Sequence, residues 1–205
     1  MEMVATMSDK KTVIVVGATG DGKSTFCNVI AGKKHNDKEF PVSRLGKSMT
    51  QETIKKEVKW RGNDFDLNLI DTPGLSDSHK RDFPNITKMI EVLKELESVD
   101  AFVLVIHGDN VNQLSSYFRN MIVVFILCFG KEFLLQNTIV EVSNWHYDDA
   151  AERGRKINGM SEERAIRQIN EEIDEIIKRE DIIEGLNLPV SVMTIAESRI
   201  NLIYT

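Results

Sequence analysis

A glycine-rich segment near the start of the chain has the residue types and spacing that bind phosphate. Residues 17–24 read GATGDGKS and fit the pattern G-x-x-x-x-G-K-[ST]. Glycines let successive backbone N–H groups point at an anion, a lysine reaches nucleotide phosphates, and a serine hydroxyl binds Mg²⁺. An ordinary glycine turn is the alternative. The segment follows an apolar run and opens a helical pattern, which is the setting that a phosphate site requires.

We therefore predict that Lys23 binds the β- and γ-phosphates of a nucleotide and serves catalysis, and that Ser24 binds Mg²⁺. The residues expected to contact the nucleotide in this segment are Thr19, Gly20, Asp21, Gly22, Lys23, Ser24 and Thr25.

A second polar group, Asp71-Thr72-Pro73-Gly74, follows the alternating apolar segment 65–70. A carboxylate at the end of a strand beside the phosphate loop can hold Mg²⁺ directly or through water, so we assign Asp71 to the metal. Gly74 can offer its backbone N–H to a γ-phosphate, which would give it a catalytic role. The pattern D-x-P-G is a common turn by itself, and its position after the glycine-rich segment favours the functional interpretation.

The segment between these two motifs should contain a hydroxyl that closes over Mg²⁺ and the γ-phosphate. Thr50 is our choice, as a metal ligand and a catalytic residue, and Thr53 is the alternative. Ser43 and Ser48 lie in the same loop, so the residues alone leave this assignment open.

The order of apolar segments predicts an α/β domain with a mostly parallel six-stranded sheet and helices on both faces. We expect a disordered leader over residues 1–11 and a single domain over residues 12–205. Residues 53–60 and 65–70 are predicted to form a hairpin. The other predicted strands are 12–16, 100–106, 138–142 and 190–193, and the predicted helices follow Lys23 and span 83–97, 114–129 and 161–179.

Composition excludes several classes of protein. The 205 residues carry a formal net charge of −6, which argues against a nucleic-acid partner. The two cysteines, Cys27 and Cys128, lie in apolar surroundings and are expected to be reduced packing residues. Residues 121–129 are all apolar but fall short of the roughly 20 that a membrane span needs. The start of the chain has no signal-peptide pattern, so we expect a cytoplasmic protein.

Several of these segments together resemble the GIMAP, or avirulence-induced-gene (AIG), GTPases, which are relatives of septins and of chloroplast envelope import GTPases. The matching segments are GATGDGKSTFCNVIAG at 17–32, Ser48-Met49-Thr50, DTPGL at 71–75 and CFGKEF at 128–133. The resemblance covers about residues 12–192. It implies the P-loop GTPase fold, GTP or GDP with Mg²⁺, a switch cycle and assembly of protomers through their nucleotide faces. Thr50 falls where the family keeps its switch threonine.

The guanine-reading element departs from the common pattern. The strand 138–142 leads into Ser-Asn-Trp-His-Tyr-Asp without the Asn-Lys-x-Asp spacing of many GTPases. Asn144, Asp148 and Glu197 are our candidates to bind the N–H groups of the base. Trp145 would stack on the ring or cover it. The alternative is that this loop only packs against the protein.

The catalytic element departs as well. Leu75 stands where Ras-like GTPases carry a glutamine that positions water, and residues 107–110 lack the arginine that some family members show there. We therefore expect slow hydrolysis by the isolated monomer, with acceleration from a partner or a second protomer. His107 could polarise water, although a histidine at a strand end is more often structural. The rival hypotheses are a P-loop ATPase or kinase and a nucleotide-bound scaffold that does not hydrolyse.

The apolar helix predicted over 114–129 raises the question of assembly. Its expected sheet face contains Tyr117, Met121, Val124, Phe125 and Cys128, which leaves Ile122, Val123, Ile126, Leu127 and Phe129 partly on other faces. Either the helix 161–179 covers them, or they form a nucleotide-dependent homodimer contact. The family usually continues with further helices after its last strand. A missing C-terminal region of that kind would be the route to peripheral membrane association.

Overall fold

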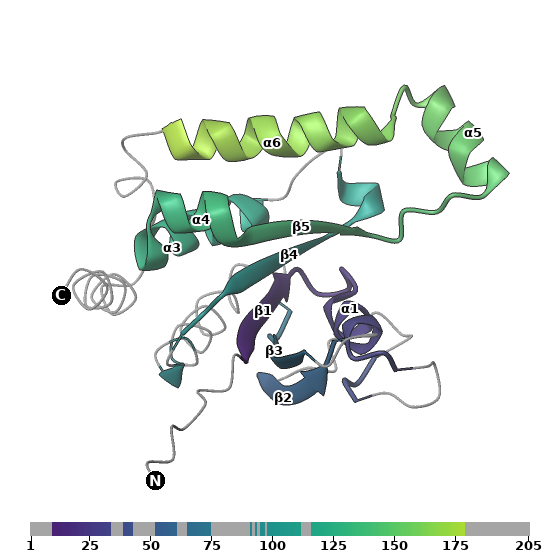
Figure 1. Cartoon of the computed structure of the whole chain (residues 1–205). Helices are drawn as coiled ribbons and strands as arrows, with labels where there is room; N and C mark the ends of the chain where they lie inside the picture. The colour runs from purple at the N-terminus through teal and green to yellow at the C-terminus, as the bar shows by residue number, and fades with distance from the viewer. Residues whose placement is uncertain are drawn as a thin grey trace, which may run out of the picture.

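Five strands form the central sheet of the computed structural model (Figure 1). Their order is β2-β3-β1-β4-β5, and only β2 runs antiparallel, to its neighbour β3. The structure describes residues 10–33, 39–42, 52–60, 65–74, 91, 93, 95, 96, 98–111 and 116–178. The strands are β1 (Lys11–Gly17), β2 (Ile54–Lys59), β3 (Asp66–Asp71), β4 (Ala101–His107) and β5 (Thr138–Ser143).

The predicted mostly parallel sheet and the predicted hairpin are confirmed. The predicted sixth strand, 190–193, lies outside the described residues, so the described sheet has five strands. Strand β1 begins at Lys11, one residue inside the segment that we assigned to a disordered leader.

Six helical segments belong to the described part of the chain. Three of them, η1, α4 and α5, fall in stretches for which the sequence predicted no helix. They are α1 (Lys23–Ile30), η1 (Gly108–Asn110), α3 (Ser116–Phe129), α4 (Lys131–Asn137), α5 (Asp149–Ile157) and α6 (Glu162–Lys178). Residues 91, 93 and 95 are also helical, within the predicted helix 83–97.

Alternation along the central strands divides the core between the two faces of the sheet. Ile14 and Val16 of β1 point to one face and pack with residues of α3 and α6, whereas Val15 points to the other face and packs with Cys27 of α1. Figure 1 shows α1 on one side of the sheet and α3, α4 and α6 on the other. Because both faces are covered, strands β1 and β4 are apolar almost throughout.

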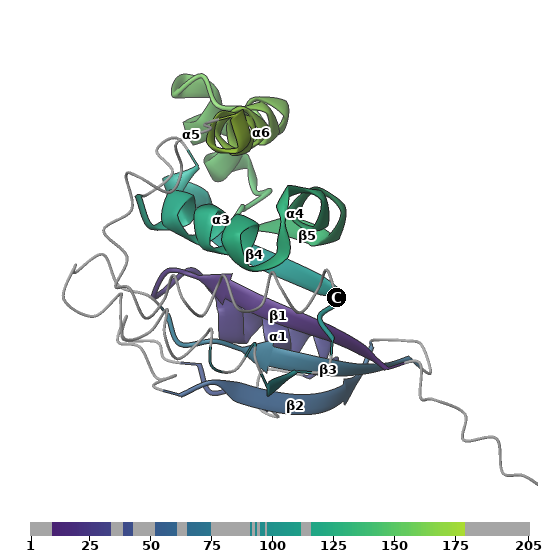
Figure 2. The same cartoon turned by 90° about the vertical axis from the view of Figure 1, so that its left-hand side faces the viewer.

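Helix α6 packs against α3, which supports the interpretation that the helix 161–179 covers it. In Figure 2, α6 lies beyond α3 and α4 as seen from β1. Arg119 of α3 pairs with Glu172 of α6 at 2.7 Å. Ile122 and Val123, which we had placed partly on other faces, are buried in the core, and Phe129 packs against Phe102 with ring centroids 4.9 Å apart. The covering interpretation is therefore supported for these side chains, and the nucleotide-dependent homodimer stays a prediction.

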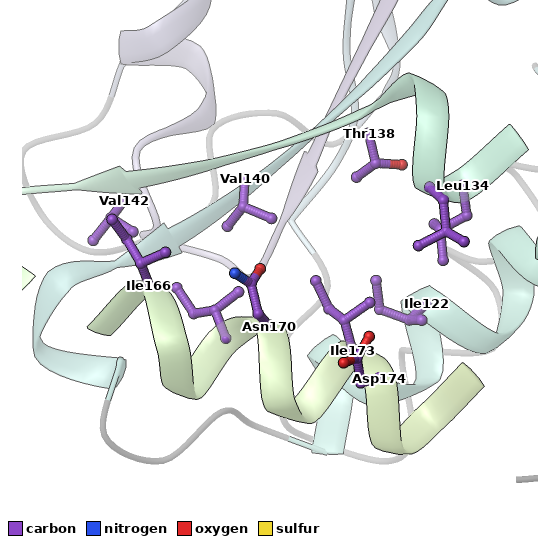
Figure 3. Close-up of a pocket in the computed structure, with 11 residues that line it drawn as sticks. Ile122, Leu134, Thr138, Val140, Val142, Ile166, Asn170, Ile173 and Asp174 are labelled. Carbon is purple, nitrogen blue, oxygen red and sulfur yellow. The ribbon is translucent and has the colours of Figure 1, made fainter. Parts of the chain in front are cut away.

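A cavity of about 550 Å³ lies between α6 and β5 (Figure 3). Apolar side chains such as Val140 and Ile169 line most of it, and Thr138, Asn170 and Asp174 add polar atoms. None of the predicted nucleotide-binding residues lines this cavity, so it is not the predicted phosphate site. No helix in the described part of the chain is long and apolar enough to cross a membrane.

Candidate functional site

The predicted phosphate loop connects β1 to α1 at the C-terminal edge of the sheet. Gly22 has φ of +93° and immediately precedes α1, a backbone conformation that favours glycine. The Lys23 ammonium lies back over the loop and donates to the Ala18 carbonyl at 2.8 Å. The side chain of Asp21 also serves the loop, because its Oδ2 accepts from the Ala18 N–H at 3.0 Å. The structure brings together all the residues predicted for this segment, Thr19, Gly20, Asp21, Gly22, Lys23, Ser24 and Thr25.

Lys23 is a buried cation at the start of a helix. Only 6% of the residue is exposed, and its burial lowers the pKa of the ammonium, although the carboxylates of Asp71 and Asp21 act in the opposite direction. An ammonium has three N–H donors, and the Ala18 carbonyl accepts from one of them. A phosphate at the N-terminus of α1 would supply both further acceptors and a compensating negative charge.

Ser24 and Asp71 form the polar pair that a Mg²⁺ site requires. The Ser24 hydroxyl donates to Asp71 Oδ2 at 2.6 Å. The register aligns Asp71 of β3 with Val15 of β1, so the carboxylate lies beside the root of the phosphate loop. Burial raises the pKa of Asp71, while the hydrogen bond from Ser24 and the charge of Lys23 oppose that shift.

The second carboxylate oxygen provides the test of whether Mg²⁺ fits. Asp71 is fully buried, and within the described residues no group donates a hydrogen bond to its Oδ1. A buried carboxylate oxygen without a donor is costly unless a cation or water completes it. Magnesium binds through few protein oxygens and keeps waters and phosphate oxygens as its other ligands. The Ser24 hydroxyl and the Asp71 carboxylate therefore fit Mg²⁺.

The segment after Asp71 packs tightly against the phosphate loop. Thr72 donates its hydroxyl to the Val15 carbonyl at 2.8 Å, which fixes the end of β3 to β1. A Cβ built on Gly74 would lie 2.5 Å from Thr19 Oγ1 and 2.7 Å from Thr19 Cα. Only glycine allows this approach, so the segment predicted to sense the γ-phosphate touches the loop predicted to hold it.

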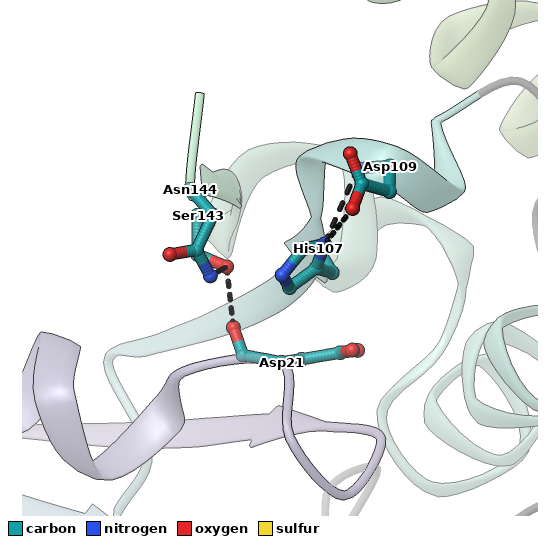
Figure 4. Close-up of polar contacts among 5 residues, drawn as sticks. All are labelled: Asp21, His107, Asp109, Ser143 and Asn144. Carbon is teal, nitrogen blue, oxygen red and sulfur yellow. Dashed lines mark hydrogen bonds and ion pairs between the residues drawn. The ribbon is translucent and has the colours of Figure 1, made fainter. Parts of the chain in front are cut away.

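A residue that we did not predict connects the phosphate loop to β5. The Ser143 hydroxyl donates to the Asp21 carbonyl at 2.6 Å (Figure 4). Its Cβ and Oγ lie 3.3 Å from the position that a Cβ on Gly22 would occupy. The last residue of β5 therefore holds the outer turn of the phosphate loop. The sequence offered one signal for this role: a hydroxyl residue stands directly after the predicted strand 138–142.

The predicted base-reading residues have structural roles of their own. Asn144 is exposed, has φ of +54° and donates to Ser143 Oγ at 3.3 Å. Asp148 caps α5 by accepting from the N–H groups of Ala150 and Ala151, and these bonds lower the pKa of its carboxyl. Trp145 is half-buried, with the Arg155 guanidinium 4.6 Å from its ring centre. The packing interpretation of this loop thus has support, and base recognition by these residues stays a prediction.

His107 has a local role at the end of β4. Its Nδ1 accepts from the Asp109 N–H at 3.3 Å and caps the short helix η1 (Figure 4). This geometry favours the structural interpretation of His107.

Another unpredicted residue, Asn28, fixes the described segment 39–42 to α1. Its amide nitrogen donates to the carbonyls of Ser24 and Phe40, and its amide oxygen accepts from the N–H groups of Glu39 and Phe40. An asparagine one helical turn after Ser24 was the only signal in the sequence. The predicted residues Thr50 and Glu197, and Leu75 at the predicted water-positioning place, lie outside the described residues.

Comparison with known proteins yields partial matches to GTPases and nucleotide-binding proteins. Immune-associated nucleotide-binding protein 13 of Arabidopsis thaliana is 30% identical over 169 residues, which cover 81% of this chain and 47% of that protein. GTPase Der of Persephonella marina is 40% identical over 98 residues, covering 47% of this chain and 20% of that protein. The chain thus spans about half or less of the length of these relatives.

Solved structures show the same fold at low sequence identity. A structure of the chloroplast translocon components atToc33 and psToc159 has a TM-score of 0.61 and 20% identity, covering 87% of this chain and 67% of that one. Toc33 from Arabidopsis thaliana in complex with GDP and Mg²⁺ has a TM-score of 0.56 and 19% identity, covering 92% of this chain and 67% of that one. The likeness confirms the predicted P-loop GTPase fold.

The model of the AIG1 family matches residues 11–178, from the first residue of β1 to the last residue of α6. This range contains the phosphate loop, the Ser24–Asp71 pair and the loop that follows β5. The resemblance drawn from the sequence motifs is therefore confirmed, and the chain belongs to the AIG1 family.

Proposed function

We propose that this chain binds GTP and GDP with Mg²⁺, hydrolyses GTP slowly to GDP, and acts as a molecular switch. The observation that carries the proposal is the 2.6 Å bond between Ser24 and Asp71, beside the buried ammonium of Lys23. Relatives with GTPase in their names and neighbours in complex with GDP and Mg²⁺ or with Mg²⁺ and GMPPNP support the choice of ligand.

The residues of the proposed phosphate site divide the binding of phosphate and metal between them. Lys23 and the backbone N–H groups of the loop bind phosphate oxygens, and Ser24 with Asp71 holds Mg²⁺. Bound Mg²⁺ would neutralise charge that develops between the β- and γ-phosphates. Thr50 and the backbone of Gly74 would sense the γ-phosphate, and the packing of Gly74 on Thr19 supports the second assignment.

Guanine preference is the finer part of the proposal. Asn144, Asp148 and Glu197 remain our candidates to bind the base, with Trp145 beside it. Asp148 Oδ1 accepts both capping bonds, so its Oδ2 is the atom that would accept from the base. We also propose a cytoplasmic location and no nucleic-acid partner. The net charge of −6 supports the second of these, because nucleic-acid-binding proteins usually carry a basic excess.

Slow turnover follows from the residues at the catalytic positions. Leu75 cannot orient water, and residues 107–110 contain no arginine. An arginine supplied by a partner is worth about 10³–10⁵ in rate in other GTPases. A nucleotide-dependent homodimer is one source of such help. One neighbouring structure is described as showing that dimerization is important for the GTPase activity of atToc33 and psToc159.

Single-turnover hydrolysis tests the proposal, with the protein in excess over GTP. Phosphate should appear slowly in the presence of Mg²⁺ and should not appear with a chelator or with Lys23→Ala. A specific rate that rises with protein concentration would support help from a second copy. Nucleotide binding without any turnover would favour the non-hydrolysing scaffold, and equal turnover of ATP would favour a P-loop ATPase.

A further inference from the structure

Asp21 is a buried acidic residue inside the phosphate loop. Only 8% of the residue is exposed, and its two neighbours in the chain, Gly20 and Gly22, have φ of +92° and +93°. Its carboxylate oxygen Oδ2 accepts from the Ala18 N–H at 3.0 Å, and its carbonyl accepts from the Ser143 hydroxyl at 2.6 Å. In Figure 4 the carboxylate extends away from Ser143. The side chain of Asp21 is therefore held within the loop.

An acidic side chain at this place needs a physical explanation. A loop of this shape attracts anions, because its backbone N–H groups and the N-terminus of α1 favour negative charge. Asp21 has the same sign of charge as the phosphates that the loop is proposed to bind, so its side chain repels them. It also accepts from one N–H of the loop. The prediction that Asp21 contacts the nucleotide does not explain why the residue is acidic.

The position of Lys23 supplies a reason. Its ammonium donates to the Ala18 carbonyl at 2.8 Å, so the ammonium and the Asp21 carboxylate bond to the two ends of the same residue. Standard bond lengths then place the two charged groups within about 10 Å of each other. Burial lowers the pKa of Lys23, and the carboxylates of Asp71 and Asp21 oppose that shift. The two acids thus compensate a buried cation that phosphate would compensate in a nucleotide complex.

The two acids differ in what Mg²⁺ does to them. We assigned Asp71 to the metal together with Ser24, so a bound cation would neutralise its charge. Asp21 is not part of that pair, and its Oδ2 accepts from a backbone N–H instead. The charge of Asp21 therefore remains near the phosphates in the proposed complex, where like charges oppose each other.

We propose that Asp21 is a positioning residue that sets nucleotide affinity by taking the place of phosphate as the compensating charge for Lys23. When no nucleotide is bound, its carboxylate stabilises the loop and the ammonium. When GDP or GTP binds, the same carboxylate opposes the phosphates, which weakens binding and accelerates release. This inference rests on the proposed function, because it concerns how strongly the proposed phosphate site holds its ligand.

Asp21→Asn separates the charge of this side chain from its shape. The amide oxygen can still accept from the Ala18 N–H, but the negative charge is removed. Calorimetric titration and the dissociation rate of a labelled nucleotide would measure GDP binding, and the melting temperature without ligand would measure stability. Asp66→Asn makes the same change at an exposed position at the start of β3 and is the matched control.

The two measurements should move in opposite directions. Asp21→Asn should bind GDP about tenfold more tightly, with dissociation slowed by a similar factor. Its melting temperature without ligand should nevertheless fall by about 2–4 °C, because Lys23 loses a compensating charge. The control should match the wild type in both. A side chain that only caps the loop would leave both values unchanged, and a damaged loop would lower both affinity and stability. Either result would overturn the proposal.

A double-mutant cycle with Lys23→Met tests the compensation without any ligand. In that background Asp21→Asn should no longer lower the melting temperature, because the ammonium that needs the carboxylate is absent. An equal loss in both backgrounds would overturn the proposal, since the carboxylate would then stabilise the loop independently of Lys23. Failure of the wild-type protein to bind GDP would instead overturn the proposed function, and this cycle would still decide whether Asp21 compensates Lys23.

Discussion

The phosphate end and the base end of the candidate site are built in different ways. At the phosphate end, Lys23 and Asp71 are buried, and Ser24 bonds directly to Asp71. At the base end, Asn144 and Asp148 are exposed, and Asp148 caps a helix. One end is packed into the sheet and the other is a surface loop.

This difference follows from what each end must recognise. Phosphate is bound largely by backbone N–H groups, a lysine and a metal, so its site needs a fixed loop shape and few residue types. A base is recognised by side chains that reach its edge, and many loops can supply them. A strict sequence motif is therefore expected at the first end and not at the second.

The largest effect expected is that of Lys23→Ala. The variant removes charge-assisted hydrogen bonds to the phosphates, so GDP affinity should fall by at least about a hundredfold. The fold should persist, because the substitution also removes a buried cation whose pKa burial lowers. Calorimetric titration and a thermal melt measure the two quantities. An unchanged affinity for GDP would show that residues 17–24 are an ordinary turn.

Asp71→Asn should remove most of the contribution of Mg²⁺ to nucleotide affinity, while it keeps the shape of the side chain. We expect Mg²⁺ to bind about 10- to 100-fold more weakly, measured as the gain in nucleotide affinity between chelator and Mg²⁺. A full Mg²⁺ effect in the variant would contradict the assignment of Asp71 to the metal.

The same variant tests a pH dependence. Burial raises the pKa of Asp71 in the folded protein. The folded state therefore holds this proton at pH values where the unfolded chain has released it. The resulting stabilisation is complete below the ordinary pKa of the carboxyl and is lost as the pH rises through the raised value. Urea unfolding across this window should show the loss in the wild type, and Asp71→Asn should not show it.

Gly74→Ala should damage the contact between the segment after β3 and the phosphate loop. The new methyl group would lie within 2.7 Å of the Thr19 backbone, which cannot move aside as a flexible side chain does. We expect a loss of about 1–3 kcal/mol in the free energy of unfolding, together with weaker binding of a GTP analogue. An unaltered denaturation midpoint would mean that the two segments separate freely.

Ser143→Ala should have the smallest effect and should reveal whether the two ends are connected. The variant leaves the Asp21 carbonyl without its hydroxyl donor, at a cost of about 1 kcal/mol. Dissociation of labelled GDP should accelerate about fivefold. Ser143→Thr keeps the hydroxyl and is the control. Equal dissociation rates for all three proteins would show that β5 does not hold the phosphate loop.

Much of the fold could be predicted because the order of apolar and polar residues along each strand reflects which of its side chains are buried. Strands β1 and β4 appeared as continuous apolar runs, and the hairpin of β2 and β3 as alternation around a polar turn. Helix α5 could not be predicted in this way. None of its residues is buried, so it has no apolar face, and it depends on the Asp148 cap and the Arg155–Trp145 contact.

The candidate site shows the same division. Lys23, Ser24 and Asp71 were predictable because their spacing reflects one backbone shape and one strand register. Ser143 and Asn28 were not, because each acts through a contact that only the folded chain creates. The covering of α3 was left open, since an apolar helix has the same pattern whether another helix or another protein covers it.

The central claim is that the loop 17–24 belongs to a guanine-nucleotide site, and competition binding tests it most directly. Labelled GDP would be bound to the wild-type protein with Mg²⁺ and displaced by unlabelled GTP, GDP or ATP. We predict that GTP and GDP compete at similar concentrations and that ATP requires at least about a hundredfold more. Displacement by ATP as readily as by GTP would contradict the account, because the loop after β5 would then not read the base.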